Sequence, residues 1–281
     1  MRFRGASVLL LLSLVALVVA SGCQIAPATK LKAVTSTSLL SALVKQMAGD
    51  RVEVAEIVPA GACPGHFDVK PSDVQLLAQA RLFIKHGQPW EGEVFTEAVV
   101  RSAQNPNLVV KAANIPGNWM EPSVQAQGAD FVASALGELD PANKAYYQGN
   151  ADKLKSAIQA KGAEVAARLA AAKVSEVKVL CALQQEGFVR WAGFNVVATY
   201  PRPEDMTPAQ IRDVVAAAKA AGVALVIDNL QSGADAGKGM AEEIGARQLT
   251  ISNFPGAFEN TATWDKAIDK NVDMLLAKLA K

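Results

Sequence analysis

The chain has 281 residues, in which 28 lysines and arginines almost balance 27 aspartates and glutamates. This balance argues against a nucleic-acid-binding protein, because such proteins need a basic surface to neutralise phosphates. Hydrophobic residues make up 51% of the sequence, which is enough for a sizeable core, and the length predicts about two domains.

Residues 1–22 have the pattern of an export signal. Two arginines precede an apolar run from Val8 to Ala20, which is too short to span a membrane. Small residues directly before Cys23 resemble a lipobox, in which the cysteine is acylated and becomes the mature N-terminus. Plain cleavage is the alternative, because Ala20 stands where leucine is typical. With lipidation, residues 23–31 are an anchored tether, and the protein is exported to the periplasmic or extracytoplasmic face of the membrane.

After the tether, short β-branched segments alternate with helical segments up to residue 139. We predict strands at 32–35, 52–58, 82–84 and 108–110, and helices at 38–48, 71–80 and 90–102. Strands that alternate with helices indicate βαβ units and a parallel sheet. Residues 32–139 are therefore predicted to form an N-terminal α/β lobe.

Residues 140–173 have a different composition. They are rich in alanine, lysine and glutamate, and no proline follows Pro141 at their start. A helix of this length spans about 45 Å, which is longer than one small lobe needs. We predict a connector helix between two lobes.

A second βα series occupies residues 174–281. The expected strands are 177–180, 196–199, 223–227 and 248–251, and the expected helices are 186–192, 207–221, 238–244 and 263–279. The fold class that follows is α/β, with two Rossmann-like lobes joined by one long connector helix. Each lobe is a mostly parallel sheet flanked by helices.

Five local motifs occur in an order that resembles a known family. They are Gly49–Val54, Pro59–Asp73 with His66, Gly87–Glu91, Leu139–Asn143 and Tyr147–Asn150. Together they are similar to the zinc- and manganese-type (cluster A-I) solute-binding lipoproteins of ABC importers. The resemblance implies a two-lobed, monomeric protein that captures a metal ion or metal complex in the interlobe cleft. It also implies delivery to a cognate permease with a small hinge motion.

The resemblance implies three histidines and one acid as metal ligands, but this sequence departs from that set. His66 matches the first ligand, whereas Gly117 stands at the position of the second. The stretch Leu180–Glu186 contains no histidine for the third, and Asn253 stands where the acid is expected. We therefore expect a degenerate site rather than the family's usual zinc or manganese site.

One interpretation is a rebuilt metal site. Cys63 and His66 on one loop, with Cys181 at the end of a strand, would form a soft site for zinc or another thiophilic transition metal, completed by Glu186 or Asn253. The alternative is a disulfide between Cys63 and Cys181, which an oxidising compartment favours. That disulfide would remove both thiolates as ligands.

A third interpretation is an apolar cleft for an organic ligand or a metal complex, in which His66 gives one axial bond to a chelated metal. Aromatic residues are expected near such a cleft, and ordinary core packing is the alternative for each of them: Phe67, Trp90, Trp119, Phe188 and Trp191. His86 is interpreted as a solvated loop residue rather than a ligand.

An enzyme and a surface adhesin are the two alternative classes of protein. An enzyme is not expected, because the common nucleophile, phosphate-binding and zinc-protease motifs are missing from the sequence. A reactive pair of Cys63 and His66 is the one catalytic arrangement that the sequence offers. A surface adhesin is the other alternative, and it would have neither a cleft ligand nor a permease.

Overall fold

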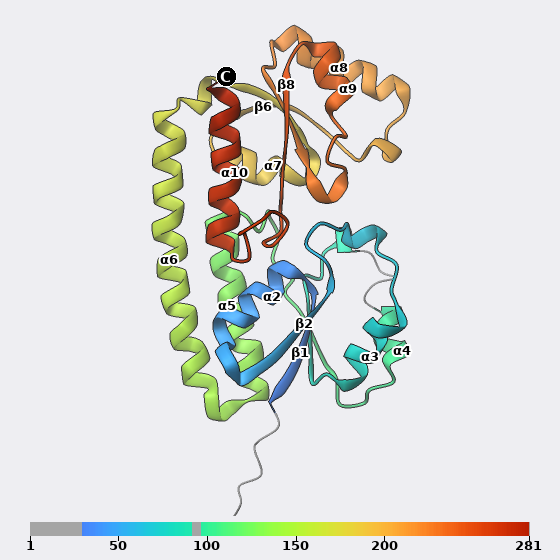
Figure 1. Cartoon of the computed structure of the whole chain (residues 1–281), viewed down its shortest axis with the longest axis vertical. Helices are drawn as coiled ribbons and strands as arrows, with labels where there is room; N and C mark the ends of the chain where they lie inside the picture. The colour runs from blue at the N-terminus through green and yellow to red at the C-terminus, as the bar shows by residue number, and fades with distance from the viewer. Residues whose placement is uncertain (1–29, 92–96, 281) are drawn as a thin grey trace, which may run out of the picture. The chain divides into compact units, whose positions relative to one another are not determined.

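Two parallel sheets form the framework of residues 31–281 in the computed structural model (Figure 1). The structure describes residues 30–91 and 97–280. The predicted signal segment 1–22 and the lipidation site Cys23 lie outside the described residues. Within the described ranges, no helix combines the length and the apolar character that crossing a bilayer needs.

The first sheet has the strand order β2-β1-β3-β4, and all its pairs are parallel. Its strands are β1 (Leu31–Thr37), β2 (Val52–Val58), β3 (Leu82–Lys85) and β4 (Val109–Ala112). The helices that accompany it are α2 (Ser38–Ala48), α3 (Pro71–Gln79) and α4 (Val99–Ala103). In the register, Ala33 of β1 lies opposite Val54 and Leu82.

The second sheet repeats this topology with the order β6-β5-β7-β8, again in parallel. Its strands are β5 (Lys178–Ala182), β6 (Asn195–Tyr200), β7 (Leu225–Asn229) and β8 (Arg247–Ile251). The helices are α7 (Glu186–Trp191), α8 (Pro208–Ala221), α9 (Lys238–Ile244) and α10 (Trp264–Leu279). The α8 boundaries follow from Thr207, which caps the helix with its side chain, and from Gly222, whose φ of 74° ends it.

Short 3-10 helices occupy many of the connections. They are η1 (Gly49–Arg51), η2 (Pro64–His66), η3 (Pro89–Glu91), η5 (Pro141–Asn143), η6 (Val174–Glu176), η7 (Leu183–Gln185), η8 (Pro203–Asp205) and η9 (Leu230–Ser232). Of the helix predicted at 90–102, the structure describes η3 near its start and α4 near its end. The predicted residues 92–96 lie outside the described residues.

Helix α6 (Lys144–Ala171) is the predicted connector, and it contributes to the core beside each sheet. Tyr147 and Ala151 belong to the first core, whereas Ile158 and Val165 belong to the second. Leu154, between these two pairs, packs against both cores. Two parallel sheets joined by this helix confirm the predicted fold class.

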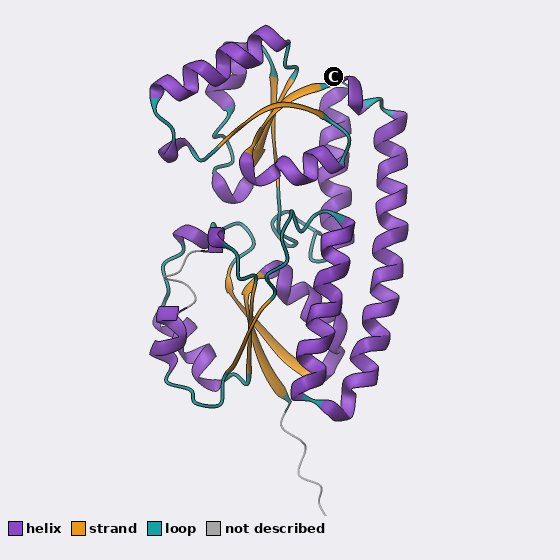
Figure 2. Cartoon of the chain, turned by 180° about the vertical axis from the view of Figure 1, so that it is seen from behind, coloured by secondary structure: helices purple, strands orange, loops and turns teal. Residues whose placement is uncertain are grey.

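Helix α5 (Pro122–Leu139) lies beside α6 (Figure 2). The sequence patterns do not predict it, because its buried face contains small and polar residues such as Gln125 and Gly128. Gly128 is needed for close packing: a Cβ there would lie 2.5 Å from the indole of Trp119. The indole of Trp119 therefore packs directly on α5.

Candidate functional site

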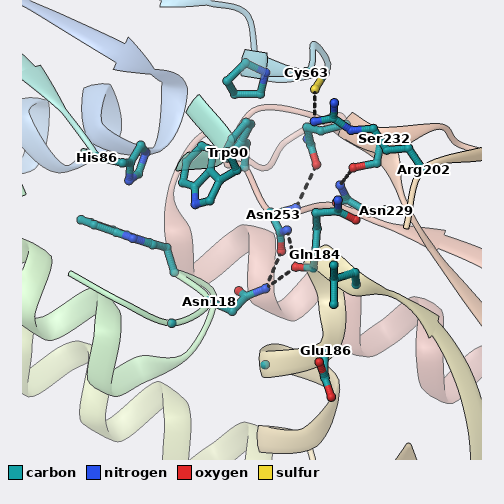
Figure 3. A pocket seen from close by; sticks show the side chains of 17 residues that line it. Cys63, His86, Trp90, Asn118, Gln184, Glu186, Arg202, Asn229, Ser232 and Asn253 are labelled. Carbon is teal, nitrogen blue, oxygen red and sulfur yellow. Dashed lines mark hydrogen bonds between the residues drawn. The ribbon is translucent and has the colours of Figure 1, made fainter. Parts of the chain in front are cut away.

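A pocket of about 290 Å³ lies among the segments that follow the strands of both sheets (Figure 3). The first sheet contributes residues that come after β2, β3 and β4: Cys63, Pro64, His86, Trp90, Gly117, Asn118 and Trp119. The second contributes residues that come after β5, β6, β7 and β8, or end β7: Leu183, Gln184, Glu186, Gly187, Arg202, Asn229, Gln231, Ser232, Asn253 and Phe254. Open α/β sheets bind ligands at the carboxyl ends of their strands, which makes this pocket the candidate site.

Aromatic rings form one wall of the pocket. The His86 ring lies 4.7 Å from Trp90 and 4.6 Å from Trp119 between centroids, and it meets Trp119 edge to face. The Trp90 ring lies 6.4 Å from Phe254, which comes from the second half of the chain. Of the five aromatic residues expected near the cleft, Trp90 and Trp119 line this wall.

The other three aromatic residues pack elsewhere. Phe188 is fully buried in the core of the second sheet, and its ring stacks on Trp191 with centroids 5.8 Å apart. Phe67 packs against the hydrophobic cluster to which β1, β2, β3, α3 and α4 contribute. For these residues the alternative of ordinary packing describes the structure.

His86 is a buried residue, and its interpretation as a solvated loop residue is wrong. Its side chain has no exposed surface, and its Nε2 lies 2.9 Å from Oγ1 of Thr37. Its Nδ1 has no hydrogen-bond partner among the described residues. Burial lowers the pKa of His86 to about 3, so the ring is neutral at physiological pH.

Glu91 fixes the loop that carries His86. Its carboxylate accepts hydrogen bonds from the backbone N–H groups of His86 (2.8 Å) and Gly87 (2.7 Å) and from the hydroxyl of Ser36 (2.5 Å). Burial raises the pKa of Glu91, and these hydrogen bonds oppose the rise. The Gly87–Glu91 motif therefore has a structural basis, because its acid closes the turn.

An amide network joins three loops at the base of the pocket (Figure 3). The Asn118 amide donates to Oδ1 of Asn253 (3.0 Å) and to the carbonyl of Gln184 (2.9 Å). The Asn253 amide also donates to the Gln184 carbonyl, at 2.9 Å. These bonds connect segments that follow β4, β5 and β8.

Arg202 joins Cys63 and His66 at the edge of the pocket. Its Nη2 donates to Sγ of Cys63 at 2.8 Å, and its Nη1 lies 2.9 Å from Nε2 of His66. The imidazole is also 3.5 Å from the carboxylate of Glu204, and more than half of its side chain is exposed. Cys63 belongs to the lining of the pocket, whereas His66 lies outside that lining.

Cys181 lies away from this group. It is fully buried in the core of the second sheet, and burial, followed by the charge of Glu186, raises the pKa of its thiol to about 12. Cys63 and Cys181 are both free in the structure, and the disulfide between them stays a prediction. Cys181 lies in the apolar core, while Cys63 contacts Arg202 at the pocket.

The remaining predicted site residues, Glu186 and Asn253, both line the pocket. Glu186 is paired with Arg190 at 2.9 Å and lies far from Cys63 in Figure 3. Within the described residues, no group of three or more His, Cys, Asp or Glu side chains could hold a metal ion. The rebuilt Cys63–His66–Cys181 site is thus not assembled in this structure.

Gly117 has a conformation that disfavours a ligand side chain at its position. Its φ is 102°, in a region that L-residues rarely adopt, and a Cβ there would lie 2.9 Å from Cγ2 of Val124. A histidine at this position would therefore need a different backbone. The difference from the family's ligand at Gly117 therefore involves the backbone conformation of the loop and not only the side chain.

Comparison with known proteins agrees with this fold. Residues 33–277 match the family described as "Zinc-uptake complex component A periplasmic". The chain belongs to this zinc-uptake component A family. The family resemblance inferred from the five motifs is confirmed.

Curated proteins that resemble this chain are named as lipoproteins of streptococci. The manganese ABC transporter substrate-binding lipoprotein PsaA of Streptococcus pneumoniae is 29% identical over 141 residues, which cover 43% of this chain and 46% of the relative. The metal ABC transporter substrate-binding lipoprotein SsaB of Streptococcus sanguinis is 26% identical over 212 residues, which cover 66% and 68%. The chain spans about half the length of the first curated relatives it matches.

Solved structures share the fold. A cadmium-bound periplasmic metal-binding protein from Candidatus Liberibacter asiaticus has a TM-score of 0.75 at 17% identity and covers 89% of this chain and 100% of its own. The solute-binding protein FpvC of Pseudomonas aeruginosa, in complex with Ni²⁺, has a TM-score of 0.75 at 20% identity and covers 89% and 97%.

Several polar residues of the pocket are not predicted as site residues from the sequence, and Arg202 and Asn118 are the most prominent. Others follow or end the strands of the second sheet: Gln184, Asn229, Gln231 and Ser232. Most of them come shortly after the end of a predicted strand, such as 196–199 or 223–227. Ligands of open α/β sheets bind at strand ends, and this rule would have predicted these residues as site residues.

Proposed function

We propose that the chain is the extracytoplasmic solute-binding component of an ABC importer. It captures a metal ion or metal complex in the pocket and delivers it, as a monomer, to a cognate permease. Membership of the zinc-uptake component A family supports this function, because members of that family are transport components and not enzymes. Relatives named for manganese, and related structures that hold cadmium or nickel, support a metal-containing cargo.

One observation carries the choice between an ion and a complex. The pocket of about 290 Å³ is lined mainly by aromatic rings and neutral amides, and the described residues offer no group of three metal-binding side chains. Divalent transition metals need several nitrogen, sulfur or carboxylate donors. The cargo therefore brings most of its own donors, as a chelated metal does.

Within this proposal, Cys63 and Asn253 contact the cargo in the pocket, and Glu186 borders it. His66 at the rim gives one axial bond to the chelated metal once the ring leaves Arg202. Cys181 remains in the core. A metal-free organic ligand, the alternative derived from the sequence, is not favoured by the names of the relatives.

The anchor is a separate part of the proposal. Cys23 carries the lipid, and the residues up to 31 tether the protein to the outer face of the membrane. Relatives named as lipoproteins support this. Labelling of expressing cells with a radioactive fatty acid should mark the wild-type chain, and Cys23→Ser should abolish the label. A Cys23→Ser chain that is labelled as strongly as the wild type would exclude this anchor.

Native mass spectrometry tests the cargo. The chain from Gln24 onward, purified without chelator or reductant, should carry a metal together with additional organic mass. After unfolding, dialysis and refolding, Zn²⁺ or Mn²⁺ alone should not be retained. Tight binding of the bare ion after refolding would contradict the proposal that the cargo is a metal complex. A metal-free organic adduct would contradict the proposal that the cargo contains a metal.

A matched pair of variants locates the cargo. Ser232 lines the pocket, so Ser232→Trp should reduce its volume and lose the adduct. Ser156 lies on the exposed surface of α6, so Ser156→Trp should retain the adduct. Equal retention by both variants would place the cargo outside this pocket.

A further inference from the structure

The pocket has an unbalanced positive charge. Arg202 is the one lysine or arginine in its described lining, and Glu186 is the one acid there. Glu186 is paired with Arg190 at 2.9 Å, and His86 is neutral. Arg202 is therefore the charged residue of the described lining that has no salt-bridge partner.

The guanidinium of Arg202 has weak hydrogen-bond acceptors as its present partners. Nη2 donates to Sγ of Cys63, and Nη1 faces the ring nitrogens of His66. Thiol sulfur is a poor acceptor, and imidazole carries no negative charge to balance the guanidinium. Arg202 forms no ion pair with an acid among the described residues, and the carboxylate of Glu204 lies 3.5 Å from Nδ1 of His66.

A third donor of Arg202 is unused. Its Nε is buried and has no hydrogen-bond partner among the described residues. Arginine is the residue that binds carboxylates and similar anions with two parallel N–H donors. A partly buried guanidinium that has weak acceptors and a free N–H group is thus poised for an anion.

The surrounding loop holds the guanidinium in place. A Cβ at Gly65 would lie 3.0 Å from the carbonyl of Trp90 and 3.4 Å from Nη2 of Arg202. The glycine therefore permits the loop after β2 to pack closely on the arginine. The side chain is positioned before any solute arrives, which limits the entropy lost on binding.

We propose that Arg202 is an anion-binding subsite that takes a carboxylate-type group of the solute. The cargo class that follows is a chelate or organic molecule with net negative charge, and free divalent cations are repelled. The identity of the cargo as a metal complex rests on the proposed function. The subsite itself does not, because it is derived from the partners of Arg202.

Cys63 is a reporter of this charge, because its sulfur lies 2.8 Å from Nη2 of Arg202. The test compares two methanethiosulfonates of similar size, one with a sulfonate and one with a trimethylammonium group. The Cys63 thiolate attacks the sulfenyl sulfur, a mixed disulfide forms, and methanesulfinate leaves. Rates are divided by those of a small free thiol, so that intrinsic reactivity cancels.

In the chain from Gln24 onward, the anionic reagent should react about tenfold faster than the cationic one, and high salt should reduce this preference. Arg202→Gln should abolish it, whereas Arg202→Lys, which keeps the charge, should retain most of it. Arg212→Gln, at an exposed position of α8, should match the wild type. Cys63→Ala should remove the reaction itself.

Equal rates for the two reagents in the wild type, or a preference that survives Arg202→Gln, would overturn the subsite. Loss of the preference in both Arg202→Gln and Arg202→Lys would also overturn it, because the residue would then act through packing and not through charge. None of these rates depends on the natural cargo. The subsite and the proposed transport function can therefore fail separately.

Discussion

The side-chain amide of Asn118 donates a hydrogen bond of 3.0 Å to Oδ1 of Asn253, although the two residues are 135 positions apart. Asn118 follows the last strand of the first sheet, and Asn253 follows the last strand of the second. The same amide of Asn118 also reaches the carbonyl of Gln184. One short side chain thus links both halves of the described structure at the base of the pocket.

Asn118→Ala should destabilise the protein by about 1–2 kcal/mol, because the Gln184 carbonyl and Oδ1 of Asn253 each lose a hydrogen-bond donor in a partly buried site. Urea unfolding followed by circular dichroism measures this change. Asn195→Ala is the matched control, since Asn195 is exposed on β6. Similar stability losses in the two variants would mean that the amide network contributes little.

The stability of the protein should depend on the protonation of His86. Its pKa is about 3 in the folded chain and about 6.5 when unfolded, so the unfolded state binds a proton first as the pH falls. Folding stability should therefore decrease between about pH 6.5 and pH 3, by up to about 1.4 kcal/mol per pH unit. The measurement is the free energy of unfolding against pH for the wild type and for His86→Gln.

The difference between these two curves isolates His86. Glu91 affects the pH dependence of stability with the opposite sign, because burial raises the pKa of its carboxyl. This effect is present in both proteins. The wild type should lose more stability than His86→Gln as the pH falls. Parallel curves would contradict the buried, neutral state of His86.

Gly117→Ala should destabilise the chain by about 1–3 kcal/mol, because alanine is strained at a φ of 102° and its Cβ approaches Val124. Thermal unfolding measures the effect. Gly149→Ala in α6 is the control, and it should stabilise the chain by about 0.5–1 kcal/mol, because nothing lies within 4 Å of its Cβ position. A neutral Gly117→Ala variant would show that this loop tolerates side chains.

Thiol counting should find one reactive cysteine in the native chain and two after unfolding. Cys63 is partly exposed, whereas Cys181 is buried and its thiol has a pKa of about 12. Ellman's reagent without reductant gives both numbers, for the chain from Gln24 onward. A count of zero in both states would show that a disulfide forms in spite of the separate positions of the two residues.

Much of the fold follows from local sequence patterns. The β-branched segments and the capping residues of α8 predict their elements, and the order of strands and helices predicts two parallel sheets. Helix α5 is the exception, because its apolar face is interrupted by Gly128 and Gln125. The burial of Gly128 is explained only by its packing partner, Trp119.

The sequence by itself determined the family and the two-sheet fold, and it predicts the export signal and the departure from the usual ligands, because these depend on residue types and on their order along the chain. Only the tertiary structure decided which side chains meet. It buried His86 between two indoles, separated Cys181 from Cys63 and placed Arg202 beside that thiol. The physical reason is that such contacts join residues from distant strand ends, and their geometry depends on the packing of both sheets, which no local pattern encodes.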